Sequence, residues 1–206
     1  MKPRVAVLVS GNGTNLQALI DARASGLLNS GELALVISSK ADVYALERAK
    51  QAGIQTEVAA RADFLTREAF EQRLLAILTE HRIDLIVLAG FMHILSAGFV
   101  SRFPDRILNV HPSLIPRYCG KGYYGLKVHA AVLDAGETVT GATVHMVNEV
   151  PDGGRILLQK AVDVLPGDTP ETLQKRVLEQ AEWRLLPQAA EQLCASIAAK
   201  HMEENE

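Results

Sequence analysis

Cysteine is almost absent from this sequence of 206 residues, in which only Cys119 and Cys194 occur. Two cysteines this far apart, in no paired spacing, exclude a disulfide framework and a cysteine-based zinc site. Histidine, aspartate and glutamate do not fall into metal-ligand spacings either, so we expect no metal. Ser113 lacks the Gly-x-Ser-x-Gly setting of a serine nucleophile, which argues against that class of hydrolase.

The sequence also lacks an excess of charge of one sign, because its formal net charge is -3 and its isoelectric point is about 6.1. Lysine and arginine are scattered, so we expect no binding to nucleic acid or to an anionic membrane surface. No apolar run is long enough to span a membrane, and the apolar part of "MKPRVAVLVSGNG" is too short for a secretory signal. We therefore expect a cytoplasmic protein.

Hydrophobic residues make up 48% of the sequence, which is enough for a sizeable core. No internal repeat, linker or low-complexity segment divides the chain. The sequence therefore predicts a single catalytic or binding domain over residues 1–206.

Short apolar runs alternate with amphipathic stretches, which is typical of a mostly parallel sheet covered by helices. The apolar runs predict strands over Arg4–Val9, Leu33–Ser38, Gln55–Ala59 (a short edge strand), Asp84–Gly90 and Arg106–Val110. The amphipathic stretches predict helices over Thr14–Ala22, Tyr44–Ala52, a segment capped by Thr66, and Leu126–Ala135. Asp84–Gly90 is the most apolar run and is expected at the centre of the sheet.

The pattern changes after Gly136. Thr140–Val147 and Ile156–Val164 alternate with period two, which predicts an antiparallel hairpin. Thr169 followed by Pro170 predicts the start of a long helical region, interrupted at Pro187. The expected fold is thus a single α/β domain: a Rossmann-like, mostly parallel sheet flanked by helices, with a C-terminal antiparallel hairpin.

"LNVHPSLIP" combines an apolar run with two polar side chains at its end. Alternation along a strand sends Asn109 and His111 to the same side, and Pro112 stops the strand after His111. Open α/β sheets bind their ligands at this edge, so the pair is a candidate for catalysis. Taken alone, the stretch fits equally well with two residues that only close a strand and satisfy a turn.

"SGNGTNLQ", residues Ser10–Gln17, lies between the first strand and the first helix. Its glycines allow a tight turn, and the N–H groups that begin the helix can hold a phosphate. The stretch lacks the ending of a P-loop and the third glycine of a dinucleotide fingerprint, so a monophosphate is expected. The alternative is an ordinary glycine-rich turn.

Two further stretches are ambiguous. "AGFMHIL", residues Ala89–Leu95, is unusually apolar for a loop at the functional edge, so either a flat ligand or the core covers it. Asp152 precedes two glycines and is either a turn former or, if the hairpin folds back, a partner that raises the pKa of His111. His145 and His129 are interpreted as structural residues, and His81 and His201 as surface residues.

Five stretches carry a family resemblance. "SGNGTNLQALID", "LAGFMHIL", "LNVHPSLIP", "TGATVH" and "DGG" occur in this order and at separations that resemble those of the phosphoribosylglycinamide formyltransferases, from Arg4 to about Pro187. The resemblance implies a formyltransferase fold and formyl transfer from 10-formyltetrahydrofolate, as co-substrate, to the amine of glycinamide ribonucleotide in purine (IMP) synthesis. It implies direct attack through a tetrahedral oxyanion, no metal, and only small-molecule substrates as partners. The expected assembly is a monomer or a homodimer.

The resemblance also implies roles for individual residues. Asn109, His111 and Asp152 match the catalytic trio, in which Asn109 and an imidazolium held by Asp152 donate hydrogen bonds to the oxyanion. The ribonucleotide positions are Gly13, Thr14, Asn15, Leu16, Gln17 and Glu182. The folate positions are Arg67, Met92, His93, Ile94, Leu95, Asn109, Asn148, Glu149, Val150 and Pro151.

Four features depart from the family pattern. His93 replaces an arginine, and Ser39 replaces an asparagine. The loop after Pro116, "RYCGKGYYG", is unusual, and the spacing before Glu182 is one residue longer than usual. Since His93 is expected to contribute mainly its backbone, we expect no change in the chemistry from its substitution.

Three other functions compete with this reading. Formyltetrahydrofolate hydrolase shares the trio but carries an N-terminal regulatory domain, whereas the first strand here begins at Arg4. Methionyl-tRNA formyltransferase requires a C-terminal RNA-binding domain, whereas a short acidic tail follows Pro187 here. A non-catalytic nucleotide-binding module would use Ser10–Gln17 alone and would leave Asn109, His111 and Asp152 unexplained.

Overall fold

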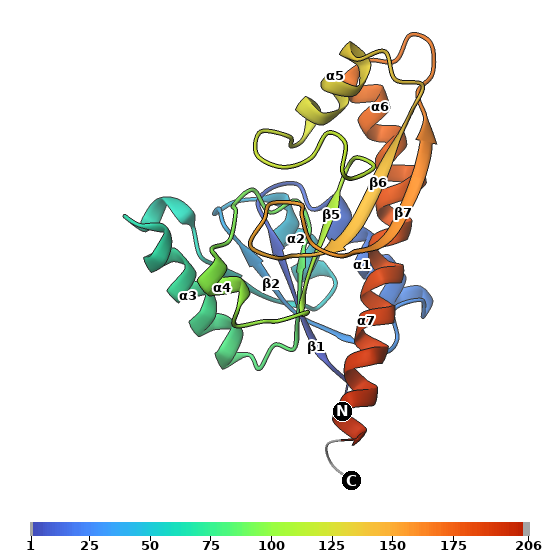
Figure 1. The fold of residues 1–206 in the computed structure, drawn as a ribbon. Coiled ribbons are helices and arrows are strands. Elements are labelled where there is room, and N and C mark those ends of the chain that lie inside the picture. Colours follow the sequence, from blue (N-terminus) through green and yellow to red (C-terminus); the bar gives the residue numbers. More distant parts are fainter. Residues whose placement is uncertain (1, 204–206) are drawn as a thin grey trace.

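A computed structural model describes residues 2–203, and its centre is one seven-stranded sheet (Figure 1). The strand order is β3-β2-β1-β4-β5-β6-β7. The strands are β1 (Arg4–Val9), β2 (Glu32–Ser38), β3 (Gln55–Val58), β4 (Leu85–Leu88), β5 (Ile107–His111), β6 (Val139–Met146) and β7 (Ile156–Asp163). The first five strands in this order are parallel, and β6 runs antiparallel to both β5 and β7.

Helices cover both faces of the sheet, as the alternation of β1 requires. The helices are α1 (Thr14–Ser25), α2 (Tyr44–Gln51), α3 (Arg67–Glu80), α4 (Ala97–Val100), α5 (Leu126–Asp134), α6 (Pro170–Val177) and α7 (Trp183–Glu203), with a short 3-10 helix, η1 (Arg61–Asp63). Val5, Val7 and Val9 pack in one core with residues of α1, α2 and α5 to α7. Ala6 and Leu8 face the other core, which α3 and α4 complete. Successive side chains of a strand point to opposite faces, so one strand serves two cores.

The predicted fold class is confirmed, and so are the strands and helices that define it. β4 occupies the middle of the sheet, β3 lies at its edge, and β6 with β7 forms the antiparallel hairpin. Thr66 caps α3 by accepting a hydrogen bond from the N–H of Ala69, and Thr169 caps α6 with Pro170 at its first position.

The predicted interruption at Pro187 is wrong, because Pro187 lies inside α7. The helical pattern changes earlier, in the π-helical turn η2 (Leu178–Glu182). A proline ring crowds the carbonyl four residues before it, here that of Trp183. Since Trp183 directly follows the wider turn, the backbone leaves regular α-helical geometry before the proline, and the helix continues through it.

The parallel strands end at one edge of the sheet, and two loops meet over that edge. Asn109 pairs with Leu88, the last residue of β4, so β5 extends beyond its neighbour and carries His111 past the end of β4. The β5–α5 loop (residues 112–125, yellow-green in Figure 1) and the β6–β7 loop (residues 147–155, orange) lie next to this point. The two ends of the described chain lie at the opposite side of the sheet (Figure 1).

Candidate active site

Asn109 and His111 project from the same side of β5 and contact one carboxylate, that of Asp152. The amide nitrogen of Asn109 lies 3.4 Å from Oδ1 of Asp152, and Nδ1 of His111 lies 3.5 Å from Oδ2. The expected juxtaposition of Asn109, His111 and Asp152 is therefore present in the structure.

Asp152 reaches this position because of the turn that carries it. Its backbone has a φ of 55°, and two glycines follow it. A Cβ on Gly154 would lie 1.8 Å from the carbonyl oxygen of Met146, so only glycine allows this close approach. Burial raises the pKa of Asp152, but the hydrogen bond from His145, the charges of His111 and His145, and the hydrogen bond from the Gly120 N–H together outweigh burial and hold the pKa below its ordinary value.

His111 is almost fully buried, with 4% of its surface exposed. Burial lowers the pKa of His111, and this effect outweighs the raising effects of the Asp152 charge and of the Tyr118 carbonyl, 2.8 Å from Nε2. The influence of Asp152 has the predicted direction, but the net pKa lies below the ordinary value. Asp152 therefore offsets part of the effect of burial and increases the charged fraction of His111.

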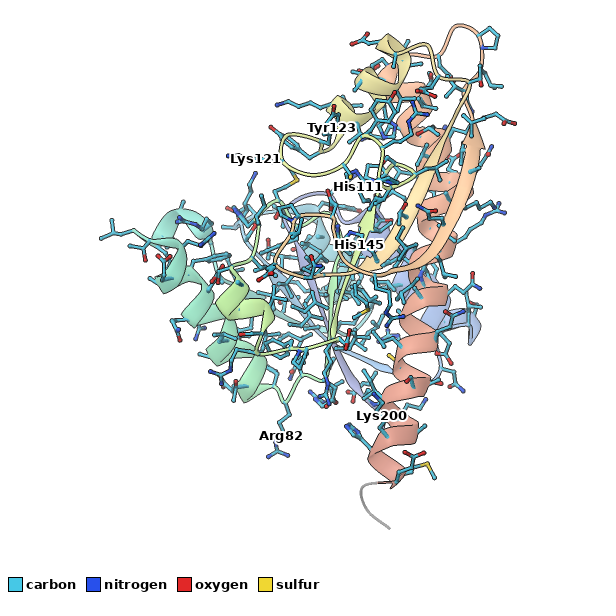
Figure 2. All side chains as sticks on the ribbon, viewed as in Figure 1. Arg82, His111, Lys121, Tyr123, His145 and Lys200 are labelled. Atoms are coloured by element: carbon cyan, nitrogen blue, oxygen red, sulfur yellow. The ribbon has the colours of Figure 1, made fainter. Side chains whose placement is uncertain are left out.

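His145 also belongs to the cluster, although the sequence was interpreted as giving it a structural role (Figure 2). β6 places it opposite Asn109, with Nε2 3.2 Å from the Asn109 amide nitrogen and 3.4 Å from Asp152 Oδ1. Its Nδ1 lies 2.8 Å from the carbonyl oxygen of Met146. Nε2 of His145 therefore contacts both the Asn109 amide and the Asp152 carboxylate, while the Met146 carbonyl holds the ring from its other side.

His129 lies near the cluster, on α5, with no exposed surface. Neither ring nitrogen has a hydrogen-bond partner among residues 2–203. Burial, and then the charge of His111, lower its pKa to about 4. The structural role of His129 therefore stays a prediction. Because this buried ring resists protonation, it should lower the stability of the fold in acid.

We expect wild-type stability to fall as the pH drops from 6.5 to 4, and His129→Phe to remove part of this fall. The pKa of His129 is about 4 when folded, below its ordinary 6.5, so the unfolded chain takes up its proton first. The contribution of His129 to the free energy of unfolding is complete well above pH 6.5, and about 3 kcal/mol of that free energy is lost by pH 4. Urea unfolding at several pH values measures this, with His81→Gln as a control. Parallel wild-type and His129→Phe profiles would contradict it.

The predicted phosphate loop joins β1 to α1. Gly13 has a φ of 75°, and a Cβ there would lie 2.7 Å from that of Ala45. The N–H groups of the first turn of α1 have no intrahelical partner, as in any helix, and no side chain caps them. Arg48, for which no motif predicts a role, donates to the carbonyl of Asn12 and to the side chain of Gln17, at 2.9 Å each. It fixes the loop and adds positive charge beside it.

Glu182 lies beside this loop, as expected. Its Oε2 accepts a 2.8 Å hydrogen bond from the Asn15 amide, and both side chains are buried. Burial raises the pKa of Glu182 to about 7, against the opposing effect of Asn15. Oδ1 of Asn15 is buried and has no partner within the described part of the chain. The pair therefore offers buried oxygen acceptors next to the helix N-terminus.

The loops that follow β4 and β6 carry apolar side chains. Met92, Ile94 and Val150 are 50%, 53% and 56% exposed, whereas Leu95 is buried. In the β6–β7 loop, Asn148 stabilises the backbone by accepting from the N–H of Val150 and donating to the carbonyl of Gly153. Glu149 and Pro151 complete this loop and are exposed.

His93 and Arg67 differ in how they relate to this apolar surface. The His93 ring packs edge-on against Phe70 and Phe91, at 5.5 and 5.3 Å, so it faces the core. Arg67, at the start of α3, lies 3.8 Å from Glu71, which accepts hydrogen bonds from the N–H and hydroxyl of Ser96. Glu71 thus connects Arg67 to Ser96, which directly follows the segment from Met92 to Leu95.

A separate hollow of about 430 Å³ lies outside α1, between α1, α2 and α7. Thr14 and Gln17 contribute to its walls, together with Arg48 and Trp183. None of Asn109, His111 and Asp152 lines it, so it is not the place of the chemistry suggested by the cluster.

Residues 2–203 contain neither a metal-binding cluster nor a helix that could span a membrane. No group of three or more histidine, cysteine, aspartate or glutamate side chains there could hold a metal ion. Within the same residues, no helix combines the length and apolar character that crossing a membrane requires.

Comparison with known proteins adds a family. A model described as "Formyl transferase" matches residues 3–190. The chain is 45% identical over 184 residues to phosphoribosylglycinamide formyltransferase of Haemophilus influenzae, covering 89% of this chain and 84% of that protein. It is 48% identical over 183 residues to the trifunctional purine biosynthetic protein adenosine-3 of Drosophila pseudoobscura pseudoobscura, covering 88% of this chain but only 13% of the length of that protein. The crystal structure of glycinamide ribonucleotide transformylase 1 from Symbiobacterium toebii superposes with a TM-score of 0.88 at 40% identity, covering 95% of this chain and 89% of that one.

Proposed function

Because the chain belongs to the formyl transferase family, we propose that it transfers the formyl group of 10-formyltetrahydrofolate to the amine of glycinamide ribonucleotide. The products are formylglycinamide ribonucleotide and tetrahydrofolate, in a step of purine (IMP) biosynthesis. The observation that carries the proposal is the cluster of Asn109, His111 and Asp152 at the end of β5.

The cluster suits an acyl transfer that passes through an oxyanion. Attack of an amine on a formyl carbon places negative charge on the formyl oxygen, and N–H donors fixed in advance stabilise that charge. We assign the donors to the Asn109 amide and to Nε2 of a charged His111. The carboxylate of Asp152 favours the charged imidazole because it lies 3.5 Å from Nδ1. We further propose that a bound water moves the proton from the attacking nitrogen to the leaving nitrogen.

The loop at the start of α1 suits the ribonucleotide. The free N–H groups of the first turn, the positive end of the helix and the nearby Arg48 all favour a phosphate. Leu16 is buried and anchors this turn in the core. The acceptors of Glu182 and Asn15 suit the hydroxyl groups of a sugar, because a hydroxyl donates to a buried oxygen that otherwise stays unpaired.

The surface of Met92, Ile94 and Val150 suits the flat ring system of the folate. These three apolar side chains, on the loops after β4 and β6, are about half-exposed, and apolar side chains that gather on an exposed surface mark binding sites. The backbone of residues 148–151 borders this surface and offers polar groups for a ring edge. The charge of Arg67 suits a carboxylate of the same ligand.

One assay tests the proposal and separates it from its rivals. Purified protein is mixed with 10-formyltetrahydrofolate, with and without glycinamide ribonucleotide, and loss of the formyl group is followed. We expect turnover only when the ribonucleotide is present. Adding a chelator should leave the rate of turnover unchanged. Rapid turnover without ribonucleotide would favour a hydrolase, and no turnover with both substrates would favour a binding module.

Three properties stay predictions from the sequence. These are the cytoplasmic location, the single catalytic domain over residues 1–206, and the monomeric or homodimeric state. Gel filtration with light scattering measures the last of them directly.

A further inference from the structure

Both ring nitrogens of the buried His111 are already occupied. Nδ1 faces Asp152 at 3.5 Å, and Nε2 lies 2.8 Å from the carbonyl oxygen of Tyr118. Since Nδ1 faces a carboxylate, only Nε2 is left to donate to a substrate oxygen. The Tyr118 carbonyl stands at the distance expected of an oxyanion from its donor, about 2.7–3.1 Å. A backbone oxygen of the protein therefore occupies the position that the proposed chemistry needs for the substrate.

The segment that supplies this carbonyl, residues 117–120, contacts both halves of the His111–Asp152 pair. The N–H of Gly120 donates to Oδ2 of Asp152 at 2.8 Å, two residues after the Tyr118 carbonyl meets His111. Tyr118 has a φ of 51°, which is unfavourable for a residue other than glycine and persists only when the surroundings hold it. Some other contact must therefore hold Tyr118 in this conformation.

Glu137 provides that contact from the turn between α5 and β6. One of its oxygens accepts from the Tyr118 hydroxyl at 2.8 Å, and Arg117 donates to both oxygens. The Glu137 side chain is only 20% exposed, whereas that of Arg117 is 62% exposed. The hydrogen bond from Tyr118, and then that from Arg117, lower the pKa of Glu137, so it stays charged near neutral pH. Figure 2 shows Tyr123 on the same loop, and its ring contacts that of Tyr118 at 6.2 Å.

We propose that residues 117–120 form a latch, in which the Tyr118 carbonyl closes the oxyanion position and Glu137 holds it closed. The proposal rests on the proposed function, because that chemistry requires a free N–H on His111. Opening exchanges one acceptor for another: the Tyr118 carbonyl leaves Nε2, and the formyl oxygen of the substrate takes its place. No covalent bond changes in this step. Once the hydrogen bond between the Tyr118 hydroxyl and Glu137 breaks, relief of the backbone strain at Tyr118 favours opening.

Several other groups influence His111 and stay in place when Glu137 is changed. Asp152 faces it from the β6–β7 loop, and His145 and His129 influence its charge from β6 and α5. Cys119 belongs to the latch itself, and its thiol donates to the carbonyl of Pro116. A change at His111 in a Glu137 variant therefore reports the Tyr118 carbonyl.

Glu137→Gln tests the latch. If the closed state hides the donor, weakening it enlarges the competent fraction, so kcat/KM for 10-formyltetrahydrofolate should rise, about threefold to tenfold. Tyr118→Phe removes one of the same hydrogen bonds and should act in the same direction. Asp134→Asn, an exposed carboxylate on α5 three residues away, is the matched control and should leave kcat/KM unchanged. A fall in kcat/KM for Glu137→Gln would mean that the carbonyl positions the imidazole, and no change would mean that Glu137 holds nothing; either overturns the latch.

A second measurement needs no substrate and therefore separates the latch from the proposed function. The amide hydrogen of Gly120 is protected by its bond to Asp152, so its exchange with solvent should be faster in Glu137→Gln than in wild type. Equal exchange rates would overturn the latch, whatever the enzyme assay shows. A wild-type protein that does not formylate glycinamide ribonucleotide would contradict the proposed function instead.

Discussion

Asp152→Asn is expected to lower kcat by about 100-fold to 1,000-fold, the loss typical of removing one oxyanion donor. The amide keeps the shape of the side chain but removes the charge that favours a protonated His111. The Asp152 charge is the largest effect that raises the pKa of His111, and burial is the largest that lowers it. Without that charge burial is opposed less strongly, so the pKa falls further, and the charged form of the donor is lost at neutral pH.

The pH profile gives the sign of this effect. Activity that needs a protonated His111 is present below its pKa and is lost as the pH rises through it. In Asp152→Asn this descending limb should move to lower pH, and the pKa of His111 followed by NMR should fall with it. KM for the folate should change less, because the interaction matters mainly where charge develops in the transition state.

Two comparisons make the experiment decisive. Asp163→Asn, an exposed carboxylate on β7, should leave kcat unchanged. Asn109→Ala should lower kcat without much change in the His111 pKa, and the double variant of Asn109 and Asp152 should lose less than the product of the single losses. If Asp152→Asn changed neither kcat nor the pKa of His111, Asp152 would be only a turn former.

Removing the phosphate from the acceptor substrate should also have a large effect. Glycinamide riboside should react with a kcat/KM about 100-fold to 1,000-fold lower than glycinamide ribonucleotide, because charge-assisted hydrogen bonds to the first turn of α1 are lost. The loss should be mainly in KM, since the phosphate lies far from the bonds that change. Steady-state kinetics with both acceptors measure it, and equal values would remove residues 10–17 from the site.

Strand periodicity predicted most of this arrangement. Alternation was enough to bring Asn109 and His111 to one side of β5, because a strand offers only two sides. The hairpin pattern was enough to suggest that Asp152 folds back, since β6 and β7 had to pair. The apolar character of Asp84–Gly90 likewise predicted the centre of the sheet.

Other features depended on register or on the backbone and left no signal in the sequence. His145 joins the cluster because it pairs with Asn109, next to an irregularity at Val144 and His145 that no periodicity fixes. The contact of Tyr118 with His111 is made by a carbonyl, which every residue possesses. The predicted interruption at Pro187 was wrong because the effect of a proline depends on the backbone geometry of the turn before it, here a π-helical turn.

The two ends of the described chain lie on the side of the sheet away from His111 (Figures 1 and 2). A partner protein joined there by a flexible linker would meet neither the Tyr118 segment nor the apolar surface of Met92 and Ile94. Affinity tags, fluorescent reporters or surface anchors can therefore be attached at either end while substrates still reach the opposite side. The same geometry lets a unit of this kind work within a much longer polypeptide, as an autonomous module whose attachment points and working face are kept apart.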